Sequence, residues 1–377
     1  MNWRSVSLGQ VGTIVGGGTP STSNSKHFGD TYPWITPKDL SKQRSRFVRT
    51  GERGITDSGL RESSAKLLPA GTVILSSRAP IGLTAIAVVP LTTNQGCRSF
   101  VPGAEVDSLF IYYLFGSMKD EFERRSNGST FKEISGSTLS ALEVLLPPLN
   151  DQREIAATLG VLDDKIDSNR RAIDLAEQLA DQVFAVKVAD RVALTDVAML
   201  TMGSSPPGDT YNLDGVGLPF YQGVRDFGRR YPGHRVWTTG PVRLAYDNDS
   251  LVSVRAPVGK LNRSPEACCI GRGVAAVSSR FPSCIYYALR ASDASWEPFQ
   301  HEGTVFGAIN KSDLSNARLP WPASDALDAL ETQLSAIDDK ILSLSKEIEE
   351  LTSLRDTLLP ELLSGRLQVG EAKGVLL

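Results

Sequence analysis

Two copies of one series of short motifs follow each other along this chain of 377 residues. Six motifs recur in the same order, and the offset between copies drifts only from 186 to 174 residues. Because a repeat at a nearly fixed period indicates a duplicated structural unit, the chain is predicted to be a tandem duplication. The paired motifs are Leu8-x-x-Val11 with Gly17-x-x-Pro20 and Leu194-x-x-Val197 with Gly203-x-x-Pro206, Pro33-Trp34 and Pro219-Phe220, Arg78-Ala79-Pro80-Ile81-Gly82 and Arg255-Ala256-Pro257-Val258-Gly259, Tyr112-Tyr113 and Tyr286-Tyr287, Gly128-x-x-Phe131-x-x-Ile134 and Gly303-x-x-Phe306-x-x-Ile309, and Asp163-Asp164-Lys165-Ile166 and Asp338-Asp339-Lys340-Ile341.

Each half divides into a part rich in Gly, Pro and β-branched residues and a part predicted to form one long helix. The runs Thr72–Leu75 and Leu83–Val89 are apolar and bounded by Gly and Pro, which is typical of buried strands. The helical part follows a proline stop in each half, at Pro147-Pro148 and at Pro320 with Pro322. We therefore expect an α+β fold with two tandem-duplicated mixed α/β domains separated by two long helices.

Apolar residues in both helical parts recur at alternating spacings of three and four, the period of a left-handed coiled coil. Forty helical residues make a rod of roughly 60 Å at about 1.5 Å per residue. Its apolar seam needs a partner, and the other helix of the same chain is the economical candidate. The predicted seam consists of Leu159, Leu162, Ile166, Ile173, Leu334, Ile337, Ile341, Leu344, Ile348 and Leu351, with Ile155, Ala176, Leu179 and Val183 in the same register. The polar seam residue Asn169 either fixes the register or is solvated where the helices splay.

Acidic residues concentrate in the two helical parts. The chain has a net charge of −3, to which residues 150–190 contribute −4 and residues 320–363 contribute −7, so the remainder carries +8. The total alone argues against a nucleic-acid partner. Its distribution instead indicates two basic domains, which suits a polyanionic partner.

Arginines and lysines cluster at a similar place in each half, interleaved with aromatic residues and glycine. Because Arg binds phosphate oxygens and pairs with guanine in the major groove, these clusters are predicted to bind DNA, although any single member can be a solvated loop charge. The repeated Arg-Ala-Pro-x-Gly segment is expected to form a tight turn between strands, with its Arg either structural or in contact with DNA. The candidate DNA-binding residues are Lys38, Lys42, Arg44, Arg46, Arg49, Arg78, Arg225, Arg229, Arg230, Arg235, Arg243 and Arg255.

Other kinds of site have little support in the sequence. The four cysteines are not spaced as C-x-x-C and only three histidines occur, so we expect no metal site, and reduced, mostly buried thiols in a cytoplasmic protein. The Gly16–Pro20 segment lacks the Lys-Ser/Thr that follows a phosphate-binding loop. We find no signal peptide, no run of about 18 apolar residues and no catalytic or cofactor constellation.

Taken together, the motifs resemble the specificity subunits of type I restriction-modification systems over nearly the whole chain. The carriers are Gly17-Gly18-Thr19-Pro20, Trp34-Ile35-Thr36-Pro37-Lys38-Asp39-Leu40, Ser76-Ser77-Arg78-Ala79-Pro80-Ile81-Gly82, Asn94-Gln95-Gly96, Leu146-Pro147-Pro148-Leu149 with Gln152-Arg153-Glu154-Ile155-Ala156, and Leu359-Pro360-Glu361-Leu362-Leu363-Ser364-Gly365. The resemblance implies target-recognition domains at 1–147 and 189–322, antiparallel spacer helices at 148–188 and 323–364 that form a coiled coil, and a C-terminal tail at 365–377.

The resemblance also implies a function and partners. Each domain would recognise one half of a split, asymmetric site in double-stranded DNA, and two methyltransferase and two motor-nuclease subunits would complete the enzyme. S-adenosylmethionine and ATP would be bound only by those partners, and this chain would have no cofactor and no catalysis of its own. The second half departs from the family pattern at Gly203-Ser204-Ser205-Pro206 and at Trp321-Pro322, as two different half-sites would favour.

Two other classes of function compete with this one. A coiled-coil scaffold with two protein-binding domains would explain the helices and the duplication, but not the basic domains. An enzyme would need a catalytic constellation, and the chain has no methyltransferase N/D-P-P-Y/F motif and no Walker motif. The charge distribution therefore favours the DNA-specificity subunit.

Overall fold

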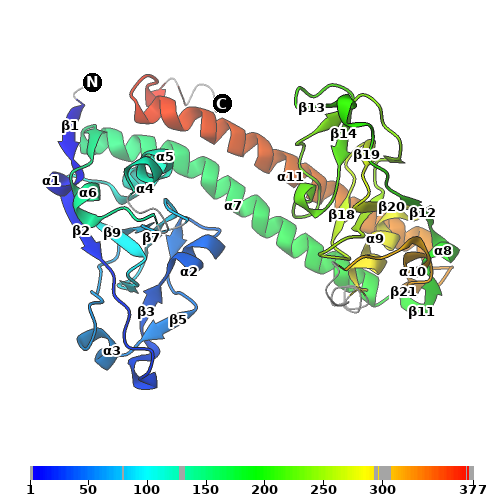
Figure 1. The fold of residues 1–377 in the computed structure, drawn as a ribbon, viewed down its shortest axis with the longest axis horizontal. Coiled ribbons are helices and arrows are strands. Elements are labelled where there is room, and N and C mark those ends of the chain that lie inside the picture. The colour runs from blue at the N-terminus through cyan, green and yellow to red at the C-terminus, as the bar shows by residue number, and fades with distance from the viewer. Residues whose placement is uncertain are drawn as a thin grey trace. The chain divides into compact units, whose positions relative to one another are not determined.

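The fold is that of a computed structural model, which describes residues 3–78, 80–126, 132–292, 296, 307–370 and 372. The chain forms two compact units: unit 1 contains Met1–Ser168 and Ile348–Leu377, and unit 2 contains Asn169–Glu347. The two long helices, α7 (Leu149–Ala185) and α11 (Leu327–Leu363), each contribute one part to each unit (Figure 1). Ala79 and the repeated Gly128–Phe131 and Gly303–Phe306 segments lie outside the described residues.

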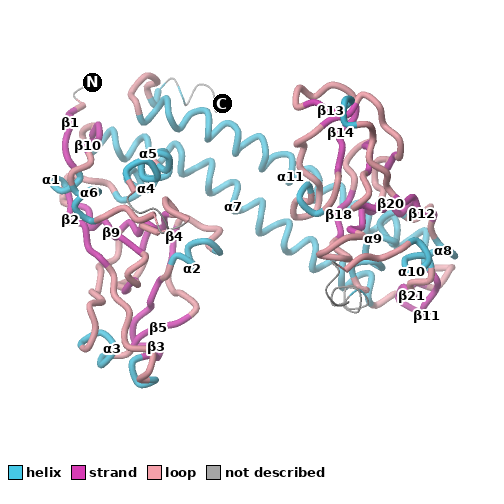
Figure 2. Tube along the Cα trace, viewed as in Figure 1, coloured by secondary structure: helices cyan, strands magenta, loops and turns pink. Residues whose placement is uncertain are grey.

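The described residues of unit 1 form three small sheets. Short helices are interspersed with these strands (Figure 2). The strands are ordered β1-β10, β2-β9-β6-β7-β4 and β5-β3-β8. Besides part of each long helix, its elements are β1 (Arg4–Ser7), α1 (Leu8–Val11), β2 (Gly12–Gly16), η1 (Ser25–His27), β3 (Phe28–Ile35), α2 (Pro37–Lys42), β4 (Phe47–Val48), β5 (Arg53–Ile55), α3 (Asp57–Arg61), β6 (Val73–Ser76), β7 (Thr84–Ala87), β8 (Thr92–Thr93), β9 (Cys97–Pro102), α4 (Ser108–Ser117), α5 (Lys119–Arg125), α6 (Gly136–Ser140) and β10 (Glu143–Leu146).

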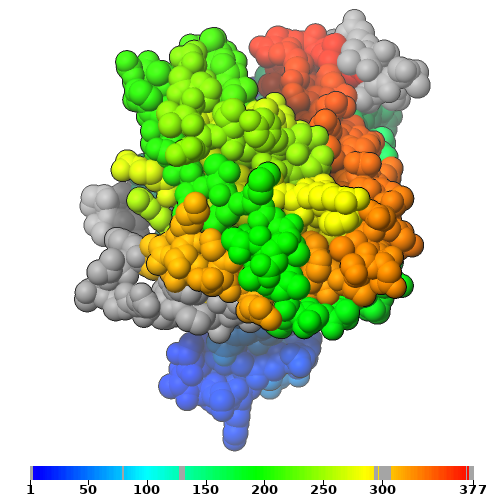
Figure 3. All heavy atoms as spheres, turned by 90° about the vertical axis from the view of Figure 1, so that its right-hand side faces the viewer, coloured from blue at the N-terminus to red at the C-terminus, as the bar shows by residue number. Residues whose placement is uncertain are grey.

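The described residues of unit 2 also form a two-stranded sheet and two larger ones, with strands ordered β11-β21, β12-β20-β17-β18 and β13-β15-β14-β19-β16. Segments far apart in the sequence lie side by side in it, as Figure 3 shows for the green and orange segments that include the antiparallel pair β11 and β21. Its elements are β11 (Val188–Ala193), α8 (Leu194–Val197), β12 (Met199–Met202), η2 (Gly208–Thr210), β13 (Tyr211–Asn212), β14 (Leu218–Tyr221), η3 (Val224–Asp226), β15 (Trp237–Thr238), β16 (Leu244–Ala245), β17 (Ser250–Ser253), β18 (Leu261–Arg263), β19 (Cys268–Ile270), β20 (Val274–Ser278), α9 (Pro282–Arg290), α10 (Lys311–Ser315) and β21 (Arg318–Pro322).

The strand registers confirm the predicted duplication. In unit 1, Val73 of β6 pairs with Phe100 of β9 and with Ile86 of β7. In unit 2, Ser250 of β17 pairs in the same way with Val277 of β20 and with Arg263 of β18. The parallel pair β3 and β8 likewise has its counterpart in β14 and β19. The two halves therefore share order, direction and register in this part of the fold.

The expected tight turn at Arg-Ala-Pro-x-Gly is confirmed in both halves. Gly82 and Gly259 have φ of 91° and 80°, in the left-handed region that glycine adopts without steric cost. The Oγ of Ser76 donates to the carbonyl of Pro80 at 2.6 Å, and the Oγ of Ser253 donates to that of Pro257 at 2.7 Å. Each turn is thus closed by a serine from the strand before it.

Both units bury an apolar core between sheet and helices. The predicted strands Thr72–Leu75 and Leu83–Val89 are confirmed as β6 and β7. In unit 1 the core joins α4 to the first part of α7 and the last part of α11, through residues such as Leu159 and Leu358. In unit 2 it joins α9 to the last part of α7 and the first part of α11, through Phe184 and Leu330. The two long helices therefore pair antiparallel in each unit, as expected.

Most residues of the predicted seam are buried, and the end of α7 differs from the prediction. The members of the seam are buried, apart from the half-buried Ile337, Ile348 and Leu351. Leu179, however, is 52% exposed, and Glu177, Ala180 and Phe184 are buried in place of Ala176, Leu179 and Val183. The buried positions 173, 177, 180 and 184 follow 169 with two consecutive spacings of four, which is a stutter that locally unwinds a coiled coil.

Two further predictions concern the helices. Asn169 is 3% exposed, and its amide nitrogen has no hydrogen-bond partner among the described residues, so the solvated alternative is wrong. No helix in the described part of the chain is long and apolar enough to cross a membrane.

Candidate nucleic-acid interface

A basic groove lies in unit 2 beside the Arg255 turn. Arg225 on η3, Arg235 and Arg255 line a pocket of about 530 Å³ together with backbone from Gly223 and Gly273. The guanidinium of Arg235 donates to Oδ1 of the buried Asp226 from Nε at 2.9 Å and from Nη2 at 2.7 Å, whereas Arg225 and Arg255 are exposed. The structure thus brings three sequence-predicted arginines to one concave surface with room for a further ligand.

In each half, an aspartate that follows a strand accepts hydrogen bonds from the backbone of the basic loop. In unit 2, Oδ2 of Asp226 accepts a hydrogen bond from the backbone of Gln222 at 2.6 Å. In unit 1, Asp39 accepts from the backbone of Thr36 at 2.9 Å and from that of Glu52 at 2.8 Å. These acceptors satisfy backbone donors that a turn would otherwise leave unpaired, so both loops are held by the same local chemistry.

Apart from Arg46, the candidates of unit 1 are exposed, but their side chains differ in their ion pairs. Lys38 and Lys42 contact the carboxylate of Glu52 at 2.9 and 3.5 Å, and the hydrogen bond to Glu52 raises the pKa of Lys38. Arg44 and Arg49 are exposed and form no ion pair within the described ranges. Two exposed guanidinium groups without an ion pair among the described residues therefore face solvent here. Arg44 lies in the loop between α2 and β4, and Arg49 directly follows β4.

The two repeated turns differ in one carboxylate. Arg78 pairs with Glu133 at 2.9 Å, and Glu133 also binds Arg98 of β9 at 2.8 Å. The backbone bridge between Arg78 and Glu133 has its counterpart between Arg255 and Ala308. Because alanine stands in place of the glutamate, no carboxylate at this position neutralises the charge of Arg255, which lines the groove. Equivalent places in the two halves therefore have different electrostatics.

The structure corrects the expectation for Arg46 and Arg230. Both side chains are buried, with 6% and 2% exposure, and both bind carboxylates of the long helices. Arg229 is exposed but also contacts Asp174 and Glu177 of α7. Arg46 and Arg230 are thus withdrawn from solvent and cannot contact phosphate in this conformation, because the desolvated pair would first have to separate. Arg243 is exposed and lies outside the groove.

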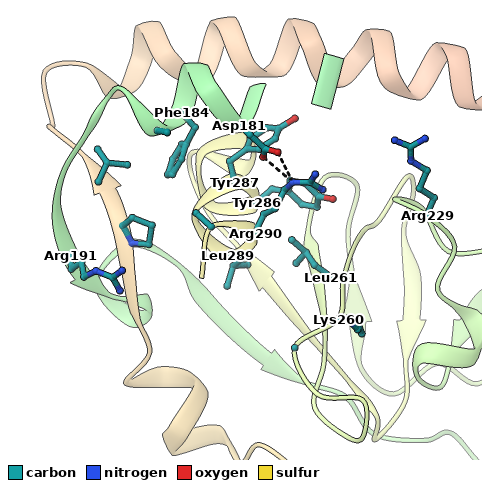
Figure 4. A pocket seen from close by; sticks show the side chains of 15 residues that line it. Asp181, Phe184, Arg191, Arg229, Lys260, Leu261, Tyr286, Tyr287, Leu289 and Arg290 are labelled. Atoms are coloured by element: carbon teal, nitrogen blue, oxygen red, sulfur yellow. Dashed lines mark hydrogen bonds and ion pairs between the residues drawn. The ribbon is translucent and has the colours of Figure 1, made fainter. Parts of the chain in front are cut away.

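A larger pocket of about 780 Å³ lies in unit 2 between the end of α7, α9 and the loop before β18 (Figure 4). In its wall Nε of Arg290 donates to both carboxylate oxygens of Asp181 at 2.9 and 3.1 Å. The ion pair joins α9 to α7, while Lys260 remains exposed at the rim. The sequence analysis did not identify Arg290 and Lys260 as residues of this pocket, or Arg98 as a partner of Glu133, because none of them belongs to a local cluster of basic residues.

The cysteines have the properties expected of core residues. Cys97, Cys268, Cys269 and Cys284 are free and buried. Burial raises the pKa of Cys97 to about 12 and that of Cys268 to about 12, so these thiols stay protonated at neutral pH. Among the described residues no group of His, Cys, Asp and Glu is placed to hold a metal ion.

Comparisons with known proteins agree with this architecture. A family model described as the type I restriction modification DNA specificity domain matches residues 1–178. The MjaIX specificity subunit of Methanocaldococcus jannaschii is 27% identical over 412 residues, covering 98% of this chain and 94% of that protein. A protein of the same organism named as the MjaX specificity subunit is 30% identical over 298 residues, covering 70% of this chain and 69% of that protein. The crystal structure of an S subunit from M. genitalium has a TM-score of 0.65 at 17% identity, covering 96% of both chains, and shows the same fold.

Fold and site together define a duplicated protein in which two α/β domains with exposed arginine clusters share a pair of long antiparallel helices. The chain belongs to the family of type I restriction enzyme specificity subunits.

Proposed function

We propose that this chain is the subunit that recognises DNA sequence in a type I restriction-modification enzyme. Its domains at 1–147 and 189–322 each bind one half of a split, asymmetric site in double-stranded DNA, and the helices at 148–188 and 323–364 hold the halves at a fixed separation. The observation that carries the proposal is the pair of equivalent, exposed arginine surfaces with different electrostatics, at Arg78 beside Glu133 and at Arg255 beside Ala308.

The duplication also supports a scaffold role. Two similar units offer two similar docking faces, so two copies of one methyltransferase subunit can bind a single asymmetric chain. Two motor-nuclease subunits complete the proposed enzyme. Those partners supply S-adenosylmethionine and ATP, and this chain performs no catalysis and needs no cofactor.

Salt-dependent DNA binding separates this proposal from a pure protein scaffold. A protein that neutralises several phosphates releases counterions, so its affinity for duplex DNA falls steeply as salt rises. We expect the chain with its methyltransferase subunits to bind duplex DNA at low salt and to lose affinity by orders of magnitude between about 50 and 200 mM salt. An affinity that is negligible, or independent of salt, would favour the scaffold.

A further inference from the structure

Arg46 and Arg230 occupy equivalent positions in the two copies of the domain. The backbone N–H of Ile86 donates to the carbonyl of Arg46 at 2.8 Å, and that of Arg263 donates to the carbonyl of Arg230 at 2.7 Å. Ile86 and Arg263 are themselves equivalent in register, since they pair with Val73 and Ser250. The backbones of Arg46 and Arg230 are therefore held by equivalent strand residues, at equivalent positions of the two units.

In unit 1, Arg46 reaches α7. Its Nη1 donates to the carbonyl of Gly160 at 2.9 Å, and its Nη2 contacts Asp164 at 2.5 Å. The hydroxyl of Tyr113, on α4, donates to Oδ2 of Asp163 at 2.7 Å and lies 3.5 Å from Nη1 of Arg46. Burial raises the pKa of Tyr113 and the Asp163 carboxylate raises it further, so the hydroxyl stays a donor.

In unit 2, Arg230 reaches α11 through the same kinds of residue. Its Nη2 binds Oδ1 of Asp338 and lies 3.2 Å from the hydroxyl of Tyr287, which donates to the same oxygen at 2.7 Å. Tyr287 belongs to α9, and the pKa of its hydroxyl is raised by burial. The repeated Tyr-Tyr and Asp-Asp-Lys-Ile motifs therefore meet in space in both units, each time around one arginine.

The second oxygen of each aspartate is also bound by an arginine, but from a different element. In unit 1 it is Arg355 of α11, at 2.7 Å from Oδ1 of Asp163. In unit 2 it is Arg263 of β18, on Oδ2 of Asp338. The position equivalent to Arg263 is Ile86, so the two halves reach one arrangement, an aspartate between two arginines, by different substitutions.

Such a cluster is poorly explained by stability alone. Burying charges costs desolvation energy, and well-packed apolar residues often stabilise a protein equally well. The cluster also restricts the orientation of the domain on the helix, because the fixed donors of a guanidinium match carboxylate oxygens in only a few orientations. Arg46 also lies between Arg44 and Arg49 in the sequence, so its anchorage holds the backbone of the segment that carries those exposed arginines.

We propose that Arg46–Tyr113–Asp163 and Arg230–Tyr287–Asp338, together the helix-docking cluster, are positioning residues for DNA recognition. Each set orients one recognition domain on the long helices and so fixes the gap between the half-sites. This rests on the proposed function. A substitution in the cluster should relax the gap without changing the bases that either domain selects.

The test selects bound duplexes from a randomised pool with the complete chain and its methyltransferase subunits. Arg46→Met keeps the apolar stem and removes the guanidinium, Tyr113→Phe removes one hydroxyl and leaves the ring in place, and Arg124→Met is the control. Arg124 is exposed on α5 and pairs with Glu121 within the same helix. We expect wild type and Arg124→Met to select one gap length, and both cluster variants to accept at least one further length with unchanged half-sites.

The outcomes separate this inference from the proposed function. If wild type selects no split motif, the proposed function fails. If wild type selects one and Tyr113→Phe, folded and assembled with its partners, keeps the same single gap, the positioning role is wrong. A loss of thermal stability with an unchanged gap would also overturn it, because that pattern belongs to a purely structural contact. Should Arg46→Met not fold, Tyr113→Phe decides.

Discussion

At the scale of single residues, charges serve two separate purposes in this protein. Exposed arginines such as Arg225 and Arg255 face solvent, whereas Arg46, Arg230 and Arg263 neutralise aspartates in the interior. The sequence places Arg46 and Arg230 in the same basic clusters as exposed arginines, because nothing local distinguishes an arginine whose partner lies more than 100 residues away. The repeated Tyr-Tyr and Asp-Asp-Lys-Ile motifs were the available signal for the buried group.

Removing Asp338 should strongly destabilise unit 2. Asp338→Ala leaves Arg230 and Arg263 buried without their shared carboxylate, and breaking a buried pair from one side costs about 3–5 kcal/mol. Asp339→Ala is the matched control: its side chain is exposed, so its effect should stay within about 0.5 kcal/mol. Urea unfolding of both variants measures the difference. Equal stabilities would mean that the buried cluster carries no net interaction.

The arginine groove of unit 2 makes a prediction about DNA. Arg225→Ala and Arg255→Ala should each weaken binding and lower the slope of log affinity against log salt by up to about one unit for each lost phosphate contact. Arg280→Ala is a suitable control, because Arg280 is exposed and distant in sequence from the basic loops. Titrations of duplex DNA at several salt concentrations give the slopes. Unchanged affinity and slope in both groove variants would remove the groove from the interface.

At the scale of elements, the two long helices and the strands within 72–75 and 83–89 were predictable, whereas the seam of α7 beyond Ile173 was not. A period of three and four identifies a coiled coil, but past Ile173 both Ala176–Leu179–Val183 and Ala180–Phe184 continue it. The structure adopts the second set, with Glu177 buried between Ile173 and Ala180. The deciding interactions are the contacts of Glu177 with Arg229, Arg230 and Arg290, which come from the globular part and leave no trace in the helix sequence.

Shortening both helices should shorten the gap between half-sites. Deleting Lys165–Arg171 and Glu347–Ser353 removes one heptad from each helix, so the seam stays in register, and it leaves the helix-docking cluster intact. Each helix loses roughly 10 Å at about 1.5 Å per residue. At about 3.4 Å per base pair, the gap should shrink by about three base pairs.

Selection from a randomised pool measures this gap directly. Three base pairs correspond to about a third of a DNA turn, so affinity should also fall unless the DNA twists. Recovery of the original gap would contradict a ruler role for the helices. Altered half-site bases would contradict the assignment of recognition to the globular domains.

At the scale of the whole molecule, duplication gives two similar units, and substitution makes them different. The turns, strand registers and docking clusters repeat, whereas Glu133 has become Ala308 and the second arginine of each aspartate comes from another element. The repeated parts could be found by comparing the halves of the sequence. The differences could not be interpreted in the same way, because their meaning depends on side-chain neighbours that only the fold defines.

The isolated chain should self-associate. Val161, Leu175, Leu179 and Val186 are exposed apolar residues of α7 and of the segment that follows it, and apolar surface of this kind marks contact sites for partners. Light scattering should show self-association that is reversed by adding the methyltransferase. The double variant Leu175→Gln with Leu179→Gln should remain a monomer. A wild-type chain that stays monomeric at high concentration, with no gain in stability from the methyltransferase, would contradict this.

Recognition of a split DNA site by two domains is the central claim, and adenine methylation in a cell tests it most directly. The chain and its methyltransferase would be expressed together in a host without adenine methylation, and long-read sequencing would map the modified bases. The account predicts modified adenines within one asymmetric motif made of two defined half-sites and a gap of fixed length and undefined sequence. Methylation at a single contiguous motif, or methylation without this chain, would contradict it.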